Sequence, residues 1–305
     1  MSDTAWRFGA IERVEGLSPE RFHQDYVARR RPVILGGLTR AWPAVQRWTP
    51  EYFQRGFPAL RVGVEVWGQD DGQSDPLHFM QHLSYAQMPL GAYIERLRAT
   101  QRPSREYYLA QFPMLRALPQ LEDDIGSLEP YMVQPALVPE RLRRRLRFPA
   151  SFWLGPAGSV STLHFDPADN LFAQIYGKKR VILASPDQAR EVYYPHERFK
   201  SMNFSPLDVE RPDFDRFPAA RALAPLSCEM VPGDVLYIPM GWWHYLRATE
   251  VSISLNFWWV YWHRLPSVFA YFGRRRLRDL RQRLGLVETI AVPPKQAAPL
   301  VPDDA

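Results

Sequence analysis

An apolar, strand-like stretch at residues 158–177, GSVSTLHFDPADNLFAQIYG, carries a histidine and an aspartate two positions apart, His164 and Asp166. Side chains at positions i and i+2 of an extended strand point to the same face. The imidazole and the carboxylate therefore converge on one point, and a divalent metal ion is the obvious group to place there. Taken alone, the two residues also fit an ordinary surface or core pair.

A third ligand is needed to hold a metal ion well, and the chain has only seven histidines. The best candidate is His244, in the segment PGDVLYIPMGWWHYLRA (232–248). Because this segment is far from His164 in the sequence, only tertiary folding can bring the two imidazoles together. Two histidines and one carboxylate form the facial triad of non-haem Fe(II) oxygenases, which leaves adjacent positions on the metal open for a chelating cosubstrate and for O2.

Lys179 lies at the start of the run KKRVILASP (178–186), whose alternation predicts a strand with Lys179, Val181 and Leu183 on one face. If that face is buried, the ammonium group needs an anion, because a buried unpaired charge costs on the order of several kcal/mol. A small dianion such as 2-oxoglutarate would supply it. The alternative is a solvated strand edge, which this run alone does not exclude.

Three segments together resemble the core of the Jumonji-C (JmjC), cupin-like oxygenases, and in particular the small hydroxylases that modify protein side chains. They are LHFDPADNLFAQIYGKKRVIL (163–183), SPLDVERPDFDRFP (205–218) and GDVLYIPMGWWHYLRATEVSISLNFWW (233–259). Their order and spacing agree with the family from about residue 107 to residue 259, with weaker similarity at PVILGGL (32–38). The resemblance implies a mainly β fold, with a double-stranded β-helix (jelly-roll) core flanked by α-helices. It also implies Fe(II) as the cofactor, and 2-oxoglutarate and O2 as cosubstrates.

The resemblance also implies roles for individual residues at matching positions. His164, Asp166 and His244 would bind the iron. Tyr108, in the YLxQ-like segment YYLAQ (107–111), and Lys179 would bind the distal carboxylate of 2-oxoglutarate.

Further residues match family positions around the cosubstrate or the substrate: Asn170 and Asn256 at the metal-proximal carboxylate, Trp258 beside the cosubstrate, and Gln111 facing the substrate. Ser161 matches a family Ser/Thr that helps to bind the distal carboxylate. Strict strand alternation would place Thr162, not Ser161, on the face of His164. We therefore expect a bulge near the start of this strand, with Thr162 as the second choice.

The activity that the resemblance implies is hydroxylation of an amino-acid side chain in a protein or peptide, with release of succinate and CO2. The endings WHYLRA and FWW favour an arginyl over an asparaginyl hydroxylase. Lysine demethylation is disfavoured, because the matching motifs belong to the hydroxylase branch. Two alternatives stay open: a tRNA-base or small-molecule hydroxylase of the same superfamily, and a non-catalytic cupin-type module that binds a metal or a small ligand.

Composition indicates an ordinary globular protein, with 46% hydrophobic and 23% charged residues. The 29 prolines suit many short strands joined by turns. We expect an N-terminal helix and strand region at 1–100 that packs on the core, a catalytic core at 101–262, and a helical region at 263–290. The proline-rich tail at 291–305 is predicted to be disordered.

The single cysteine, Cys228, excludes an internal disulfide and fits a reducing compartment. The N-terminus lacks the basic-then-apolar pattern of a signal peptide, and the longest apolar run is about half of what a bilayer span needs. These features predict a cytoplasmic protein.

The N-terminal third contains clear local signals. Helices are expected from Ser18 to about Arg30, from TPEYF (49–53) to Phe57, and over PLGAYIERLRA (89–99); strands are expected at PVILGG (32–37) and LRVGVEVW (60–67). His78 and His82, four apart, could form a metal pair on a helix. Pro76 and the lack of a third ligand favour solvated or locally bonded side chains instead.

Two arginine-rich stretches, RLRRRLR (141–147) and GRRRLRDLRQRLGL (273–286), place leucines at helical spacing. Each fits a solvated helix, and each could also dock an acidic peptide or nucleic acid. C-terminal helices can form a dimer interface in the related hydroxylases, so a homodimer is a further possibility. The net charge of +5 is modest, and no dedicated nucleic-acid motif is present. We therefore expect a protein or peptide substrate, with nucleic acid possible but not favoured, and no membrane partner.

Overall fold

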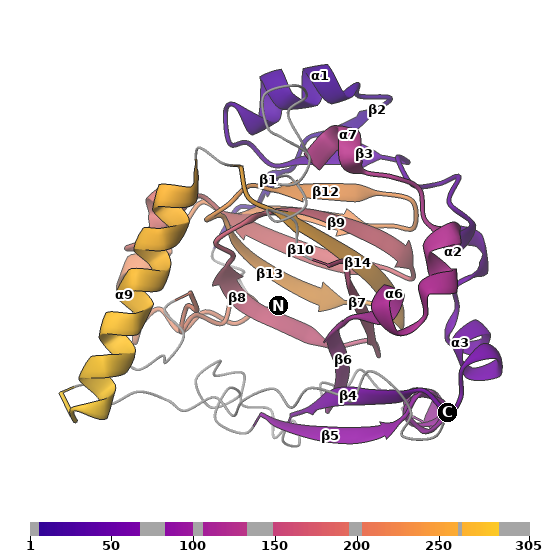
Figure 1. Cartoon of the computed structure of the whole chain (residues 1–305). Helices are drawn as coiled ribbons and strands as arrows, with labels where there is room; N and C mark the ends of the chain where they lie inside the picture. The colour runs from indigo at the N-terminus through magenta and orange to yellow at the C-terminus, as the bar shows by residue number, and fades with distance from the viewer. Residues whose placement is uncertain are drawn as a thin grey trace.

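Two β-sheets form the centre of the computed structural model, which describes residues 6–67, 83–99, 106–132, 149–194, 203–261 and 264–286 (Figure 1). The large sheet has the order β2 (Arg13–Glu15), β3 (Val33–Gly36), β12 (Val235–Ile238), β9 (Asp169–Tyr176), β14 (Ser252–Trp259), β7 (Ser151–Gly155), β6 (Tyr107–Phe112), β4 (Arg61–Val66) and β5 (Ser84–Pro89). The small sheet has the order β1 (Gly9–Ala10), β11 (Leu226–Met230), β10 (Lys179–Ala184), β13 (Trp243–Ala248) and β8 (Val160–Phe165).

From β7 to β14 the chain passes repeatedly between the two sheets. Strands β7, β9, β12 and β14 lie in the large sheet, whereas β8, β10, β11 and β13 lie in the small one, and neighbouring strands of this set pair antiparallel. Exchange of successive antiparallel strands between two packed sheets is the arrangement of a jelly roll. The predicted fold class, a mainly β jelly-roll core with flanking helices, is confirmed.

The stretch at 158–177 is two strands, not one. Strand β8 ends at Phe165 and β9 begins at Asp169, and the two belong to different sheets. Pro167 lies in the short connection between them, where its lack of an N–H group costs no sheet hydrogen bond. His164 is therefore near the end of β8, and Asp166 is just beyond it.

Helices flank the large sheet (Figure 1), and three of those described begin where the sequence predicts, after Ser18, after Thr49 and next to Pro89. The helix α1 (Pro19–Phe22) starts after Ser18, whose hydroxyl accepts a hydrogen bond from Arg21 N. It continues as a π-helical turn at His23–Val27 and so ends before the expected Arg30. The remaining helices of this layer are α2 (Pro43–Arg47), α3 (Pro50–Gly56, capped by Thr49), α5 (Leu90–Ala99), α6 (Met114–Ala117) and α7 (Glu129–Met132).

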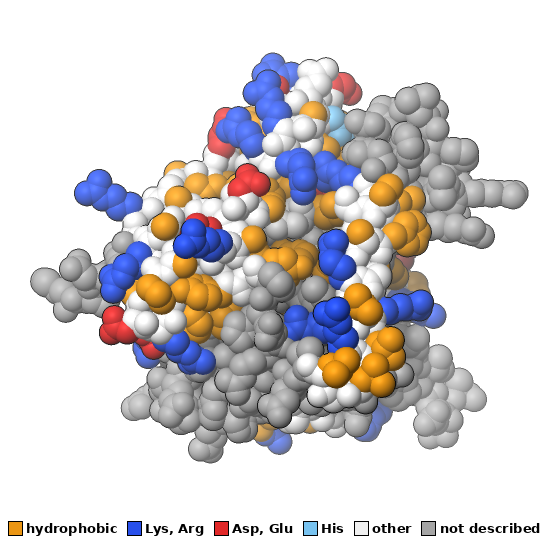
Figure 2. Space-filling view, turned by 90° about the vertical axis from the view of Figure 1, so that its left-hand side faces the viewer, with side chains coloured by type: hydrophobic (Ala, Val, Ile, Leu, Met, Phe, Trp, Pro, Cys, Tyr) orange, Lys and Arg blue, Asp and Glu red, His pale blue; other side chains and the backbone are white. Residues whose placement is uncertain are grey.

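The C-terminal helix α9 (Leu265–Arg283) lies along one side of the molecule. Tyr271 faces the body and packs against Phe165, with 5.9 Å between ring centroids. The opposite side of the helix carries large apolar side chains that are 45–69% exposed: Phe269, Phe272, Leu277, Leu280 and, just beyond the helix, Leu284 and Leu286. Figure 2 shows hydrophobic and basic side chains interleaved on this face of the molecule.

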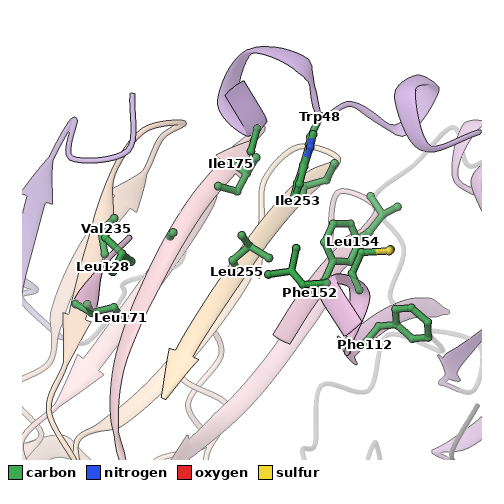
Figure 3. Close-up of a cluster of buried hydrophobic side chains, with 14 of the residues drawn as sticks. Trp48, Phe112, Leu128, Phe152, Leu154, Leu171, Ile175, Val235, Ile253 and Leu255 are labelled. Atoms are coloured by element: carbon green, nitrogen blue, oxygen red, sulfur yellow. The ribbon is translucent and has the colours of Figure 1, made fainter. Parts of the chain in front are cut away.

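The main hydrophobic core lies between the large sheet and the helices (Figure 3). Alternation along the strands divides the side chains between two faces, so that Leu171 and Val235 point to this core. Phe172 and Leu236 point instead to the space between the sheets. Trp48 anchors the helical layer, since its ring packs on Phe53 at 5.4 Å and its indole N–H donates to the buried Asp124 at 2.7 Å.

Several sequence predictions are not tested by this structure. The stretches 141–147 and 291–305 and the residues His78 and His82 lie outside the described residues. The bounds of the four predicted regions also stay predictions. Within the described part of the chain, no helix combines the length and the apolar character required to cross a bilayer.

Candidate metal and cosubstrate site

His164 and His244 meet because strands β8 and β13 pair antiparallel, with these two residues directly opposite each other. Their ring centroids are 4.1 Å apart. Asp166, in the connection after β8, completes the group: one potential ligand atom from each of the three residues lies within 4.8 Å of the others. The structure thus brings together the three side chains that the sequence indicated.

The two imidazoles are held with the same nitrogen facing the site. His164 Nδ1 bonds the backbone oxygen of Thr162 at 2.6 Å, and His244 Nδ1 bonds that of Trp242 at 2.9 Å. Because a carbonyl oxygen only accepts, each Nδ1 carries a proton, and in the neutral ring this leaves the lone pair on Nε2. This is the arrangement in which histidines bind metal ions.

Asp166 and the rings are also fixed by neighbours. Trp258 Nε1 donates to Asp166 Oδ2 at 2.8 Å, and the same oxygen is 3.6 Å from His244 Nε2. The ring of Phe204 stacks on that of His164 at 5.3 Å. Burial, followed by the neighbouring His164, lowers the pKa of His244 to about 4. His244 is therefore neutral near pH 7, as a metal ligand must be.

The segment 203–205 covers the outer edge of β8, the last strand of the small sheet. Phe165 N donates to Asn203 O at 3.0 Å, and Asn203 Nδ2 donates to Phe165 O at 2.9 Å. Ser205 N donates to Leu163 O at 2.9 Å. The strand that carries His164 is thereby hydrogen-bonded on both sides.

Lys179, on β10, is buried in the same interior. Its side chain is 2% exposed, whereas that of the neighbouring Lys178 is 42% exposed. Lys179 Nζ donates to Tyr108 Oη at 3.0 Å and to Ser254 Oγ at 2.9 Å. Among the described residues, no carboxylate lies within ion-pair distance of this ammonium group. Burial lowers the pKa of Lys179 to about 7.

Aromatic rings surround the ammonium group. The ring centroids of Phe172, Tyr108 and Trp153 lie 5.3, 5.6 and 5.9 Å from Lys179 Nζ. Burial raises the pKa of Tyr108, which keeps its phenol protonated. While the Tyr108 oxygen accepts from Lys179, its own proton is available to a second acceptor. The cluster can thus present several donors to one carboxylate.

The three candidate ligands and Lys179 line one pocket that opens to solvent. All ten residues predicted for the site line it: Tyr108, Gln111, Ser161, His164, Asp166, Asn170, Lys179, His244, Asn256 and Trp258. Asn256 Nδ2 donates to Asn170 Oδ1 at 3.1 Å, which fixes both amides. The candidate metal ligands and the buried ammonium group therefore share one pocket.

Ser161 reaches the pocket through a bulge in β8. Opposite β13, His164 pairs with His244, but Ser161 pairs with Leu246, so two residues of β8 face one residue of β13. The extra residue reverses the alternation and puts Ser161 on the side of His164. Thr162, the second choice from the sequence, is buried outside the pocket lining.

Sequence reasoning missed several residues of the site, and Ile238 and Leu246, which also line the pocket, are among them. Ser254 could have been found, because it alternates with Asn256 and Trp258 along β14 and so shares their face. Trp153, Phe172 and Phe204 surround Lys179 or stack on His164, and nothing in their spacing distinguishes them from core residues.

Comparisons with known proteins agree with this geometry. The profile of a family described as "Cupin-like domain" matches residues 19–261. The chain is 32% identical to "Lysine-specific demethylase 8" of Xenopus tropicalis over 250 residues, which are 82% of this chain and 53% of that protein. It is 28% identical to human "Bifunctional peptidase and (3S)-lysyl hydroxylase JMJD7" over 266 residues, 79% of this chain and 81% of that protein.

A third relative has a different type of substrate in its name. The chain is 28% identical to "tRNA wybutosine-synthesizing protein 5" of Gallus gallus over 265 residues, which are 84% of this chain and 78% of that protein. The chain spans only about half the length of the demethylase relatives that it matches.

We predict that the protein binds one Co(II) ion per chain, with Co(II) as a spectroscopic probe of the metal site. Replacing His164, Asp166 or His244 by Ala should weaken the affinity by more than the roughly 10–100-fold that loss of an outer-shell partner costs. Titration calorimetry measures the Kd for Co(II) of each variant. His23→Ala is the matched control, because His23 bonds Pro130 O and lies outside the pocket. Equal affinities for His164→Ala and His23→Ala would contradict the assignment.

Proposed function

Because this chain belongs to the family of cupin-like domains, we propose that it is a dioxygenase dependent on Fe(II) and 2-oxoglutarate that hydroxylates an amino-acid side chain of a protein or peptide. The observation that carries the proposal is the buried Lys179, which has no carboxylate partner among the described residues and shares a pocket with the candidate metal ligands. A buried cation needs an anion, and a small diacid that also reaches the metal supplies one.

His164, Asp166 and His244 would hold the iron. Two neutral imidazoles and one carboxylate suit Fe(II), although this ligand set also accepts other divalent metals. Bound Fe(II) would supply activation of O2, with one oxygen atom going to the substrate C–H bond and the other to succinate as 2-oxoglutarate loses CO2. The chain's own contribution is to orient the ligands, through Thr162 O, Trp242 O and Trp258 Nε1.

Lys179, Tyr108, Ser161 and Ser254 would bind the distal carboxylate of 2-oxoglutarate. The ammonium group donates to the phenol and to the Ser254 hydroxyl at 3.0 and 2.9 Å, so their orientations are already fixed before a ligand arrives. Asn170, Asn256 and Trp258 would contact the metal-proximal end. The surrounding aromatic rings would exclude water and strengthen the charge-assisted hydrogen bonds.

An arginyl rather than an asparaginyl substrate is favoured by the endings WHYLRA (243–248) and FWW (257–259), which resemble the arginyl branch of the family. Gln111, which is exposed and lines the pocket, would contact the substrate.

Two alternatives differ from this proposal in testable ways. A tRNA-base hydroxylase is supported by the similarity to the wybutosine-synthesizing protein and by the arginines of α9. A non-catalytic module would use the same pocket to bind a ligand without turnover. Demethylation of lysine, which the names of other relatives suggest, would release a carbon from the substrate instead of leaving an added oxygen.

We predict that the Fe(II)-loaded protein, given 2-oxoglutarate, 18O2 and a cell lysate, forms succinate together with peptides that carry one 18O atom. Mass spectrometry identifies the labelled residue, with arginine expected. Asp166→Ala should abolish both products. Lys179→Met should raise the KM for 2-oxoglutarate about 10- to 150-fold, because a hydrogen bond to a charged group contributes about 1.5–3 kcal/mol.

The outcomes separate the alternatives. Lys178→Met is the matched control for Lys179→Met and should behave as wild type. Label in tRNA bases would favour the nucleic-acid alternative. Binding of 2-oxoglutarate without succinate formation would favour a non-catalytic module and contradict the oxygenase.

We predict that 2-oxoglutarate affinity of the Co(II)-loaded, O2-free protein falls as pH rises above about 7. Below that pH Lys179 is already charged in the free protein. Above it, binding must first return a proton to Lys179, so Kd should rise up to about tenfold per pH unit. Calorimetry from pH 6.5 to pH 8.5 in two buffers of different ionisation enthalpy should show proton uptake approaching one at the upper end. The Lys178→Met variant should retain this pH dependence. A wild-type Kd that does not change between pH 6.5 and pH 8.5 would contradict the prediction.

We also propose that α9 carries a homodimer interface, on the support of its row of exposed Phe and Leu side chains. We predict that the double variant Leu277→Ser, Leu280→Ser shifts the protein from dimer to monomer in light scattering coupled to size exclusion. Arg275→Ser, an exposed substitution on another side of the same helix, should leave the dimer intact. A monomeric wild-type protein would contradict the interface.

A further inference from the structure

A buried ion pair joins the start of α9 to the strand next to the candidate metal site. Both Oδ atoms of Asp169 accept from Arg264 Nη1 at 2.6 Å. The side chain of Asp169 is 0% exposed and that of Arg264 is 10% exposed. Tyr237 Oη also donates to Asp169 at 2.7 Å, and Arg264 Nη2 donates to Val27 O at 3.2 Å. Such a pair is costly to break, because it leaves a charge buried and uncompensated.

The ion pair reaches the turn that leads into β13. Residues 239–242 connect β12 to β13, and Met240 N donates to Asp169 Oδ1 at 3.2 Å. The turn requires a left-handed residue, supplied by Gly241 at φ +85°. Arg30 holds the other side of the turn, since its Nη2 donates to Met240 O at 2.8 Å and its carbonyl accepts from Trp242 Nε1 at 2.9 Å.

The same turn orients two of the candidate metal ligands. Trp242 O accepts the Nδ1 proton of His244 at 2.9 Å, which sets the direction of the free Nε2. Gly241 N donates to the backbone oxygen of Asp166 at 3.0 Å, which ties the connection after β8 to the turn. A shift of this turn would therefore move the ring of His244 and the backbone of Asp166 together.

We propose that Arg264 is a positioning residue for the metal site: through Asp169 it fixes the turn 239–242, and so the orientation of His244 and Asp166. Docking of α9 on the body thereby becomes a condition for assembling the site. The inference rests on the proposed function only in taking the three residues as metal ligands. Neither Arg264 nor Asp169 lines the pocket, so both act through the turn.

The test compares Arg264→Gln with Arg13→Gln. Arg13 also pairs with a buried aspartate, Asp234, at 2.5 Å, but that pair does not contact the turn 239–242. Both variants should lose stability in urea unfolding. Only Arg264→Gln should weaken Co(II) binding, by about 10–100-fold as for other supporting residues of metal sites, and alter the visible absorption of bound Co(II). Arg264→Lys keeps the charge but not the forked guanidinium geometry, so it should lose less Co(II) affinity than Arg264→Gln. It replaces Arg264→Gln in the test if the Gln variant does not fold.

A second readout needs no metal. In 15N-histidine-labelled, metal-free protein, the Nδ1 proton of His244 should give a protected resonance through its bond to Trp242 O. Arg264→Gln should broaden or abolish that resonance, and Arg13→Gln should leave it unchanged. An unchanged resonance together with wild-type Co(II) binding in Arg264→Gln would overturn the inference. Absence of Co(II) binding in the wild type would instead overturn the proposed function, while the resonance still decides the role of Arg264.

Discussion

The burial of Lys179 is the constraint on which the rest of the site depends. An ammonium group deep between two sheets is costly unless donors, acceptors and aromatic faces surround it. Here four residues do so, Tyr108 through its phenol and its ring, Ser254 through its hydroxyl, and Phe172 and Trp153 through their rings, and each comes from a strand other than that of Lys179. The jelly roll provides that convergence, because neighbouring strands of its sheets are far apart in the sequence. A pocket that holds one buried ammonium group beside the candidate metal ligands follows from the fold together with one inward lysine.

The pairing of β8 with β13 brings two of the candidate metal ligands together in the pocket. One strand pair sets His164 opposite His244, and backbone carbonyls on the same two segments direct both rings. The orientation of both imidazole rings is therefore set by hydrogen bonds to the main chain, which substitutions of nearby side chains alter little. The buried link from Asp169 to Arg264 extends this frame to the C-terminal helix.

Much of the site could be predicted because alternation fixes which residues share a face. The i, i+2 rule paired His164 with Asp166, and the same rule applied along β14 would have added Ser254. Prediction failed where geometry is decided by tertiary context. The division of 158–177 into two strands depends on the exchange between sheets. The bulge that turns Ser161 inward is expected from the family match at Ser161, because strict alternation alone would place Thr162 on that face. Charge pairing between Asp169 and Arg264, far apart in the sequence, leaves no local pattern.

The segment 203–205 has a consequence for how a polypeptide can approach. Open sheet edges let a visiting chain add itself as an extra strand, guided by main-chain hydrogen bonds. At the end of β8 the main-chain groups of Leu163 and Phe165 are already hydrogen-bonded to residues 203–205. This part of the edge is therefore closed to strand addition, so that any polypeptide bound here has to be held by side-chain contacts.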